Sequence, residues 1–260
     1  MSDYWANRQA RAQAKLTELS IKDTEAQLIK YYRSSAKRVI KEFENTYIKI
    51  LNTVEAERAP TPADLYKLDT YWKMQGQLQR ELQKLGDYQL KAMSKNFVNL
   101  YQNVYNSIAI KDDLFFHEAD KKTAEQVINN IWCADGKSWS SRIWTNTAQL
   151  QETLNENLIH SVITGKKTSE LKQLLQERFN VSFSNADSIV RTEMAHIQTQ
   201  AAQQRYTDSG ITQVQVWANT EERRCPKCAD LHKKIYPVGA AMPVPVHPRC
   251  RCCIIPVIDD

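Results

Sequence analysis

The chain has 260 residues, of which 25% are charged and 42% hydrophobic, a composition typical of a soluble globular protein with one or two domains rather than of a disordered or membrane protein. Only six residues are glycine, which counts against sandwiches and barrels with their many tight turns, so we expect a mainly α-helical fold. A formal net charge of +5 is compatible with binding to a polyanion but does not by itself indicate it.

The N-terminal part of the chain, up to about residue 107, has the pattern of long amphipathic helices. Ile40, Phe43, Tyr47 and Ile50 recur at intervals of three and four residues, which places them on one stripe of a helix. The first residues are charged and contain no continuous apolar stretch, so we expect synthesis in a cytoplasm without a secretory signal. No apolar run approaches the roughly 20 residues of a membrane-spanning helix, so we expect no membrane contact.

A proline-rich break near residue 60 interrupts this helical pattern. Thr61 is a suitable N-cap, and Pro62 suits the first helical position because its missing N–H would be unpaired there anyway. We therefore expect a new helix to begin at Pro62 and to run to about Leu85, with Gly86 in the left-handed position that ends it. A third helix is then expected over about 87–107.

The helical pattern weakens around residues 110–120, which we interpret as a connection between domains. The sequence therefore predicts a helical N-terminal region, 1–112, and a C-terminal domain, 113–260. The C-terminal domain should itself be helical and should end in a small module of strand and loop over 217–257, so the fold class is mainly α with a minor α+β part.

Within the C-terminal half we expect three helices followed by one strand. A helix is predicted over 138–165, a short one over 168–179, and another from about Ser184 until Gly210 ends it. The segment 213–217 then alternates apolar and polar side chains, which is typical of a half-buried strand. The remainder is rich in turns and prolines.

The strongest chemical signal in the chain is a pair of cysteine motifs in this last segment. Cys225 and Cys228 are separated by two residues, and after eighteen more residues His247 precedes Cys250 and Cys252. Two thiolates on one turn and an imidazole with a thiolate on another can complete a tetrahedron around zinc. We expect Cys225, Cys228 and His247 as ligands, with either Cys250 or Cys252 as the fourth. Disulfides and buried free thiols are the alternatives.

A structural zinc ion is favoured over a catalytic one. A hydrolytic zinc site keeps one coordination position open and needs a general base nearby. The only carboxylates close in sequence are Glu221, Glu222 and Asp230, and no His-Glu-x-x-His motif is present. The thiolates suffice to close the coordination shell, and Cys253 is expected to pack as a small apolar residue.

Basic residues surround the cysteine motifs. They could form a patch that contacts phosphate groups, or they could be a solvated surface that offsets the thiolate charge; both interpretations stay open. The residues concerned are Arg223, Arg224, Lys227, Lys233, Lys234, Arg249 and Arg251.

A second group of charged residues lies on the helix that precedes the strand. Arg191 and Glu193 are two positions apart and point in different directions, so they cannot pair with each other on a regular helix. Each can instead reach another element, and burial at a helix junction is favoured over catalysis. Arg205 follows on the same helix, and His196 is expected to be a packed residue.

Three tryptophans frame a short polar segment, 136–138. Trp132 precedes it and Trp139 and Trp144 follow it, with Arg142 between the last two. Such aromatic side chains could bind a ligand beside the loop, but wedging two helices together is their commoner use.

The motifs of the C-terminal half occur in a characteristic order. The residues that carry this order are Trp139, Arg142, Ile143, Trp144, Gly165, Arg178, Phe179, Ala186, Arg191, Thr192, Glu193, Ala195, Tyr206, Gly210, Trp217, Arg224, Cys225, Cys228, Leu231, His247, Pro248, Cys250, Arg251 and Cys252. In this order the chain resembles the phage head morphogenesis family typified by protein F of phage Mu. The resemblance covers about residues 135–256 and rests on the combination of motifs.

The resemblance implies a minor capsid protein of a tailed phage, present in few copies and incorporated with the portal during procapsid assembly. Expected partners are the portal protein and a scaffold or major capsid protein, and the expected location is inside the head of the virion, where the protein could contact packaged double-stranded DNA. One departure concerns an aspartate that family members carry shortly before the first cysteine, since Glu221 and Glu222 stand in that stretch here. Because the sequence ends at Asp260, soon after the motif, we expect no added enzymatic domain.

Two enzymatic alternatives follow from the same residues. A zinc-dependent nuclease would use the cysteine and histidine cluster, and a nucleotide-binding or ADP-ribosyltransferase-like domain would use Arg191 and Glu193. The lack of a glycine-rich phosphate cradle counts against the second alternative. We therefore expect a structural protein and not an enzyme.

Overall fold

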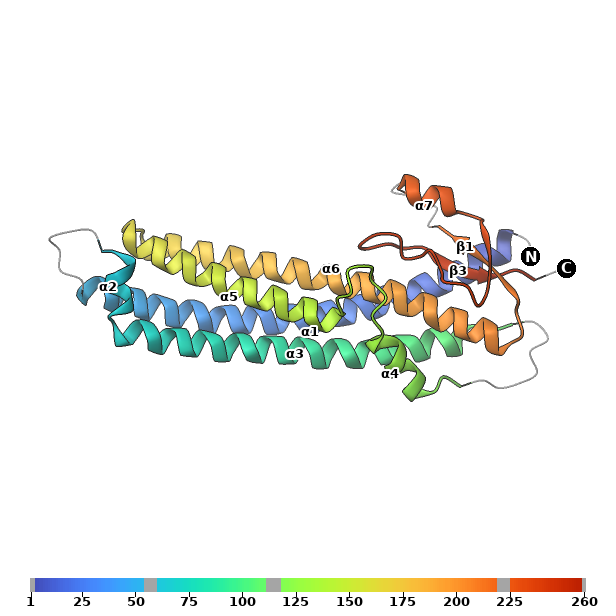
Figure 1. Cartoon of the computed structure of the whole chain (residues 1–260), viewed down its shortest axis with the longest axis horizontal. Coiled ribbons are helices and arrows are strands. Elements are labelled where there is room, and N and C mark those ends of the chain that lie inside the picture. Colours follow the sequence, from blue (N-terminus) through green and yellow to red (C-terminus); the bar gives the residue numbers. More distant parts are fainter. Residues whose placement is uncertain (1–2, 54–59, 111–117, 219–224, 259–260) are drawn as a thin grey trace. The chain divides into compact units, whose positions relative to one another are not determined.

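The protein is mainly helical, with one small antiparallel sheet near its C-terminus, as the sequence predicts (Figure 1). The computed structural model describes residues 3–53, 60–110, 118–218 and 225–258. The elements are α1 (Asp3–Thr53), α2 (Pro62–Tyr66), α3 (Asp69–Ser107), α4 (Lys121–Asn129), α5 (Trp139–Ile163), α6 (Thr168–Asp208), β1 (Gln213–Trp217), α7 (Pro226–Leu231), β2 (Ile235–Pro237) and β3 (Cys253–Pro256). Within the described ranges, no helix combines the length and apolar character needed to cross a membrane.

The chain packs into two compact units, and both are discontinuous in sequence. Unit 1 consists of Met1–Glu25, Ala92–Trp139 and Ser188–Asp260, and unit 2 consists of Ala26–Lys91 and Ser140–Asp187. The helices α1, α3 and α6 each supply residues to both units. The division into 1–112 and 113–260 is a division along the sequence, which stays a prediction.

Unit 2 is built from helical segments of α1, α3, α5 and α6. Most of the apolar stripe predicted on α1 is buried here, with Phe43, Tyr47 and Ile50 each at most 1% exposed, while Ile40 is half-buried. Its core also contains a polar network, in which Asn146 Nδ2 donates to the Ser182 carbonyl at 2.8 Å. Hydrogen bonding satisfies these polar groups, so their burial is tolerated.

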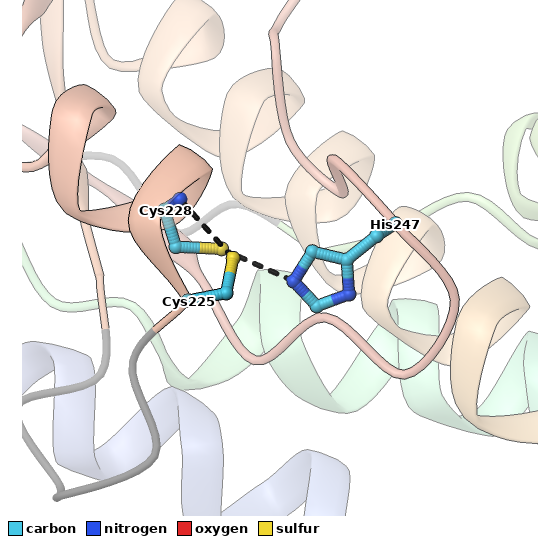
Figure 2. Close-up of side chains that lie close together, drawn as sticks. All are labelled: Cys225, Cys228 and His247. Atoms are coloured by element: carbon cyan, nitrogen blue, oxygen red, sulfur yellow. Dashed lines mark hydrogen bonds between the residues drawn. The ribbon is translucent and has the colours of Figure 1, made fainter.

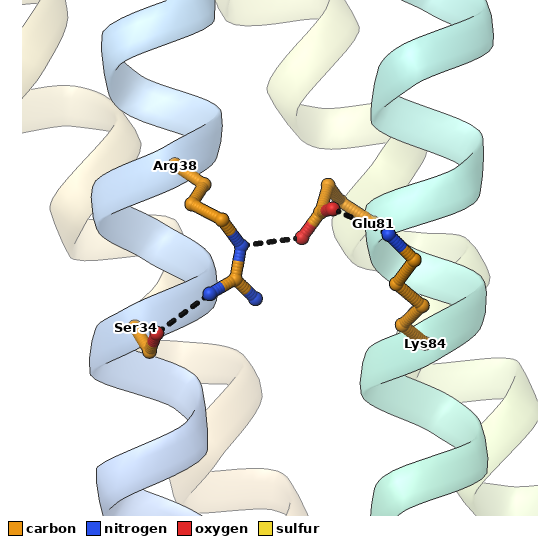
Figure 3. Close-up of polar contacts among 4 residues, drawn as sticks. All are labelled: Ser34, Arg38, Glu81 and Lys84. Atoms are coloured by element: carbon orange, nitrogen blue, oxygen red, sulfur yellow. Dashed lines mark hydrogen bonds and ion pairs between the residues drawn. The ribbon is translucent and has the colours of Figure 1, made fainter.

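An ion pair on the surface of unit 2 connects α1 with α3 (Figure 3). Arg38 Nε lies 2.7 Å from Glu81 Oε2, and Lys84 Nζ lies 3.0 Å from the other carboxylate oxygen. Burial opposes ionisation of Glu81, but Arg38 and Lys84 outweigh it, so the pKa of this carboxyl group is lowered. Such partly exposed pairs contribute about 0.2–1 kcal/mol each, so this contact fixes orientation more than stability.

The helix start predicted at Pro62 is confirmed, but its predicted length is wrong. Thr61 has an extended backbone at the N-cap, and its N–H donates to an Asp64 carboxylate oxygen at 3.0 Å. The helix ends at Tyr66, and α3 begins at Asp69. The predicted helix over 62–85 therefore combines a short helix with the first half of a much longer one.

Gly86 does not end a helix, contrary to the sequence-based expectation. It lies inside α3, which continues to Ser107 without interruption. A Cβ atom at this position would overlap the ring of Trp144 on α5, so the glycine provides room for a tryptophan. Close packing between helices, and not a left-handed backbone, explains this residue.

The break predicted between residues 179 and 184 is also absent, because α6 is one helix from Thr168 to Asp208. Ser182, which lies inside the expected break, makes tertiary hydrogen bonds with Asn146 of α5. The end of the helix at Gly210 is confirmed. This glycine has φ +74°, and Ile211 N donates to Tyr206 O at 3.0 Å, so the C-terminal carbonyls are satisfied.

Two helices in unit 1, α4 and the short α7, were not predicted. Asp120 caps α4 by accepting a hydrogen bond from Thr123 N at 2.9 Å. Residues 111–117 of the predicted connection before it lie outside the described residues.

The sheet of unit 1 has the order β2-β1-β3, with both pairs antiparallel, and confirms the strand predicted at 213–217. One face packs against the first turns of α1 in a small apolar cluster of Ala6, Ala10, Trp217, Cys253 and Ile255. Gln13 of α1 donates to Tyr206 Oη at 3.0 Å and to Ile254 O at 3.2 Å. The sheet is thereby held to α1 and α6 within one unit.

Candidate metal centre

Two segments of unit 1 supply the sulfur and nitrogen donors of the site. Cys225 is the N-cap of α7, with Pro226 in the first helical position, and Cys228 lies one turn into this helix. The Cys228 N–H donates to Cys225 Sγ at 3.3 Å, which is how a cap satisfies an otherwise unpaired helical N–H. The second segment is the loop before β3, which carries His247 and Cys250.

The donor atoms of these segments converge (Figure 2). Cys228 Sγ lies 3.2 Å from His247 Nε2 and 3.9 Å from Cys250 Sγ. The donors form two groups, and within each group the donor atoms lie within 4.8 Å of one another. One group is Cys225, Cys228 and His247, and the other is Cys228, Cys250 and Cys252. Cys228 belongs to both groups, so all five predicted ligands meet around its sulfur atom.

These separations fit the dimensions of one tetrahedral metal site. Zinc–sulfur bonds of about 2.3 Å and zinc–nitrogen bonds of about 2.0–2.1 Å place two sulfurs about 3.8 Å apart and a sulfur and nitrogen about 3.5 Å apart. The observed values are 3.9 Å and 3.2 Å. A disulfide would need sulfurs about 2.05 Å apart, and none of the six cysteines forms one. The cluster could therefore bind a metal ion.

The hydrogen bonding of His247 selects the tautomer that a metal ion requires. His247 Nδ1 lies 2.8 Å from the carbonyl oxygen of Pro248, which can only accept, so Nδ1 carries the proton. This contact raises the pKa of His247. In the neutral ring, Nε2 then presents its lone pair towards Cys228, as in metal sites where a carbonyl orients the histidine.

The thiols of the cluster have divergent pKa values. The N–H of Cys228 lowers the pKa of Cys225, and the contact with Cys252 lowers that of Cys250 to about 5. Burial raises the pKa of Cys228 to about 12, and the contact with Cys250 raises that of Cys252. Neighbouring thiols cannot all ionise without a compensating charge, whereas a dication would stabilise every thiolate.

The turn that carries His247 and Cys250 is held against α6. Cys250 N donates to His247 O at 3.1 Å, which closes the turn, and Arg249 within it has φ +61°. Arg249 N then donates to Thr192 Oγ1 at 3.2 Å. Thr192 belongs to one of the motifs in the sequence, but its contact with the cysteine segment was not predicted.

The flanking residues of Thr192 make contacts with two other segments. Arg191 pairs with Glu25 on α1, and its Nη1 also lies 3.9 Å from Glu18 Oε2. Glu193 is 5% exposed, and its carboxylate accepts a hydrogen bond from Trp132 Nε1 at 2.8 Å. Arg191 and Glu193 therefore contact different segments.

The ring of Trp132 also stacks on His196, with centroids 4.3 Å apart and planes at 7°. Burial lowers the pKa of His196 to about 4, so this imidazole is neutral near pH 7. His196 thus lies in a packed aromatic pair.

The remaining residues of the predicted structural motif make other contacts. Trp139 donates through Nε1 to Ile128 O at 3.0 Å, and Arg205 donates through Nε to Ile108 O at 3.2 Å. Trp217 is buried at the end of β1, and Arg142 is half-buried on α5 in unit 2.

The basic residues around the cysteine motifs are exposed where the structure describes them. These are Lys227, Lys233, Lys234, Arg249 and Arg251. Lys233 lies over the Trp217 ring, with Nζ 5.5 Å from its centroid. Arg223, Arg224, Glu221 and Glu222 lie outside the described residues.

The cluster borders a cavity of about 730 Å³ within unit 1. Besides the donors, α1 contributes Lys15, Thr17 and Glu18 to its wall, and α6 contributes Arg191 and Gln198. The α1 residues on this wall were not predicted from the sequence. Thr17 donates a hydrogen bond to Gln198 Oε1 at 2.5 Å, but more than 180 positions of sequence separate the two residues. Helical periodicity alone carries no signal for such a contact.

Residues 152–255 match the family model described as Phage Mu protein F like protein. The match covers less than half of the chain and includes all five donors. It confirms the resemblance found in the sequence. No curated protein and no solved structure shows a significant match.

Proposed function

From the match of residues 152–255 to the phage Mu protein F like family, we propose that this protein is a head morphogenesis protein of a tailed phage. In this proposal it is a minor capsid protein, made in the host cytoplasm and incorporated in few copies with the portal, and it lies inside the head of the virion. Its partners are the portal protein and a scaffold or major capsid protein.

We further propose that the C-terminal module holds one structural zinc ion. Cys225, Cys228 and His247 are ligands, with Cys250 or Cys252 as the fourth. The observation that carries this proposal is the convergence of four thiols and a correctly oriented imidazole from two distant segments. A zinc ion with four protein ligands would hold together a segment that has little regular structure of its own, as in other small zinc modules.

Five donors for a tetrahedral ion support a structural role over a catalytic one, because they suffice to fill every coordination position. The described donor groups contain no carboxylate. The nuclease alternative draws on the adjoining cavity, since Glu18 lies on its wall. Glu18 Oε2 lies 3.9 Å from Arg191 Nη1, so this carboxylate already takes part in an ion pair.

Metal content together with a single substitution separates these functions. We expect about one zinc ion per purified chain by mass spectrometry of the metal, and loss of zinc with a lower melting temperature in His247→Ala. A nuclease would instead show metal-dependent cleavage of phage DNA that His247→Ala abolishes while the fold persists. Metal-free wild-type protein would contradict the zinc proposal.

The assembly role is tested by co-expressing the chain with the portal, scaffold and major capsid proteins of the same phage. We expect the chain in purified procapsids at low stoichiometry when the portal is present, and its absence when the portal is omitted. Procapsids that exclude the chain under both conditions would contradict this role.

Contact with DNA, supported by the exposed basic residues, predicts duplex binding that weakens steeply as salt increases.

A further inference from the structure

One hydroxyl group connects the turn that carries two donors to the long helix α6. Thr192 Oγ1 donates to Ser188 O at 2.7 Å within the helix. The same oxygen accepts the hydrogen bond from Arg249 N at 3.2 Å. A hydroxyl can do both, because it has one proton to donate and two lone pairs that accept. Valine, which has the same shape, can do neither.

The accepted hydrogen bond acts at the middle of the ligand turn. Arg249 stands between His247 and Cys250, and its φ of +61° is a left-handed conformation that residues other than glycine rarely adopt. This conformation directs its N–H towards α6, while the N–H of Cys250 is used within the turn. The contact with Thr192 therefore fixes the segment from which both donors project.

Thr192 is itself held in place on both sides along the helix. Arg191 pairs with Glu25 of α1, and Glu193 accepts from Trp132 before α5. Three consecutive residues of α6 therefore reach three separate segments of unit 1. The Thr192 hydroxyl therefore lies on a helical turn that contacts on both sides hold in place, so it is suited to orient a metal site.

We propose that Thr192 is a positioning residue of the metal centre, holding the His247–Cys250 turn in the geometry that binds the ion. The inference rests on the proposed zinc binding and extends it to a residue outside the cysteine segments. Hydrogen-bond partners that orient metal ligands typically contribute 10- to 100-fold to metal affinity. Thr192 would act through the backbone of the turn and not through the ion.

The test compares three variants of the full-length chain. Thr192→Val removes the acceptor, and Thr192→Ser keeps it. Thr199→Val is the matched control, because Thr199 lies on the same helix, is 1% exposed, and donates to Ala195 O at 3.0 Å. Zinc affinity is measured by competition with a chromophoric chelator, and the absorption of the cobalt(II)-loaded proteins reports the coordination geometry.

We expect Thr192→Val to weaken zinc binding about 10- to 100-fold and to alter the cobalt spectrum, with Thr192→Ser restoring both to the wild-type values. Thr199→Val should keep the wild-type affinity and spectrum even if its melting temperature falls. Wild-type affinity in Thr192→Val, or equal loss in Thr199→Val, would overturn the role of Thr192 while leaving the zinc proposal intact. A wild-type chain that binds no zinc would overturn both. If Thr192→Val does not fold, Thr192→Ala against Thr192→Ser gives the same comparison.

Discussion

At the scale of single residues, Cys228 is the donor on which the proposed centre depends most, because its sulfur belongs to both groups of candidate ligands. The cysteine motifs indicated that these side chains lie close together, since short spacing places two thiols on one turn whatever the surrounding fold. The choice between Cys250 and Cys252 did not follow from spacing. Both side chains are buried, at 3% exposure each, so burial does not separate them either.

Substitution of Cys228 should remove zinc from the protein. We expect Cys228→Ser to bind less than 0.1 equivalent of zinc, whereas Cys133→Ser, at a half-buried cysteine outside both donor groups, should keep the wild-type content. Metal analysis of the purified variants checks this. The single variants Cys250→Ser and Cys252→Ser then identify the fourth ligand as the one whose loss lowers affinity more. Full zinc occupancy in Cys228→Ser would show that the centre does not form around this sulfur.

His196 should make stability depend on pH. Its folded pKa of about 4 lies below the ordinary value of 6.5, so the folded protein binds this proton less readily than the unfolded chain. The stability that the folded protein gains from a neutral His196 is fully present above pH 6.5 and is lost as the pH falls from 6.5 towards 4. The difference corresponds to about 3 kcal/mol of unfolding free energy, an order-of-magnitude figure.

His196→Phe keeps an aromatic ring on Trp132 and removes the proton-binding group. Urea unfolding at pH 7.5, 6 and 5 should therefore show a smaller loss of stability for the variant than for the wild type. Parallel pH dependence of the two proteins would be inconsistent with a neutral buried imidazole at this position.

At the scale of elements, periodicity predicted that helices form but not how far they run. The stripe on α1 and the strand β1 were confirmed because burial on one face leaves a direct pattern in the sequence. Gly86 misled the prediction because a glycine also allows close packing between helices, and the break expected between residues 179 and 184 is absent where Ser182 hydrogen-bonds with Asn146 of α5. A glycine that accommodates Trp144 and one that ends a helix are identical in sequence, and only the neighbouring helix distinguishes them.

Two glycines of α3 should respond to alanine in opposite directions. Gly86→Ala places a Cβ atom against the Trp144 ring, so we expect about 1–3 kcal/mol of destabilisation from overpacking. Gly76→Ala meets only the flexible end of Arg80 at 3.5 Å, so the gain in helix propensity should stabilise the protein by about 0.5–1 kcal/mol. Chemical denaturation of both variants measures these changes. Stabilisation by Gly86→Ala would show that Trp144 does not occupy the position described.

At the scale of the whole molecule, the packing units cut across the order of the chain. Unit 1 joins the first helical turns to the last strand, through Gln13 and Ile254 among others. Neither composition nor local pattern carries such long-range pairing, and the boundary predicted near residue 112 concerns only the order of the sequence. The cavity wall contributed by α1 was missed for the same reason.

Removing the metal should loosen unit 1 selectively. We expect a chelator to speed amide hydrogen exchange in α7, in the loop 238–252 and in β3, while the α5 segment of unit 2 keeps its protection. Exchange followed by mass spectrometry, with and without added zinc, measures this difference. Equal acceleration throughout the chain would mean that the ion stabilises the protein globally and not the module alone.

The discontinuity of unit 1 also bears on the order in which the protein folds during its synthesis. Unit 2 is complete once residue 187 has left the ribosome, so its helices can pack while translation continues. The first helical turns, by contrast, must wait for β3, because the residues that cover Ala6 and Ala10 include Cys253 and Ile255, which are synthesised after all of unit 2. Until then the nascent chain exposes this apolar face, and closure of unit 1 follows the packing of unit 2.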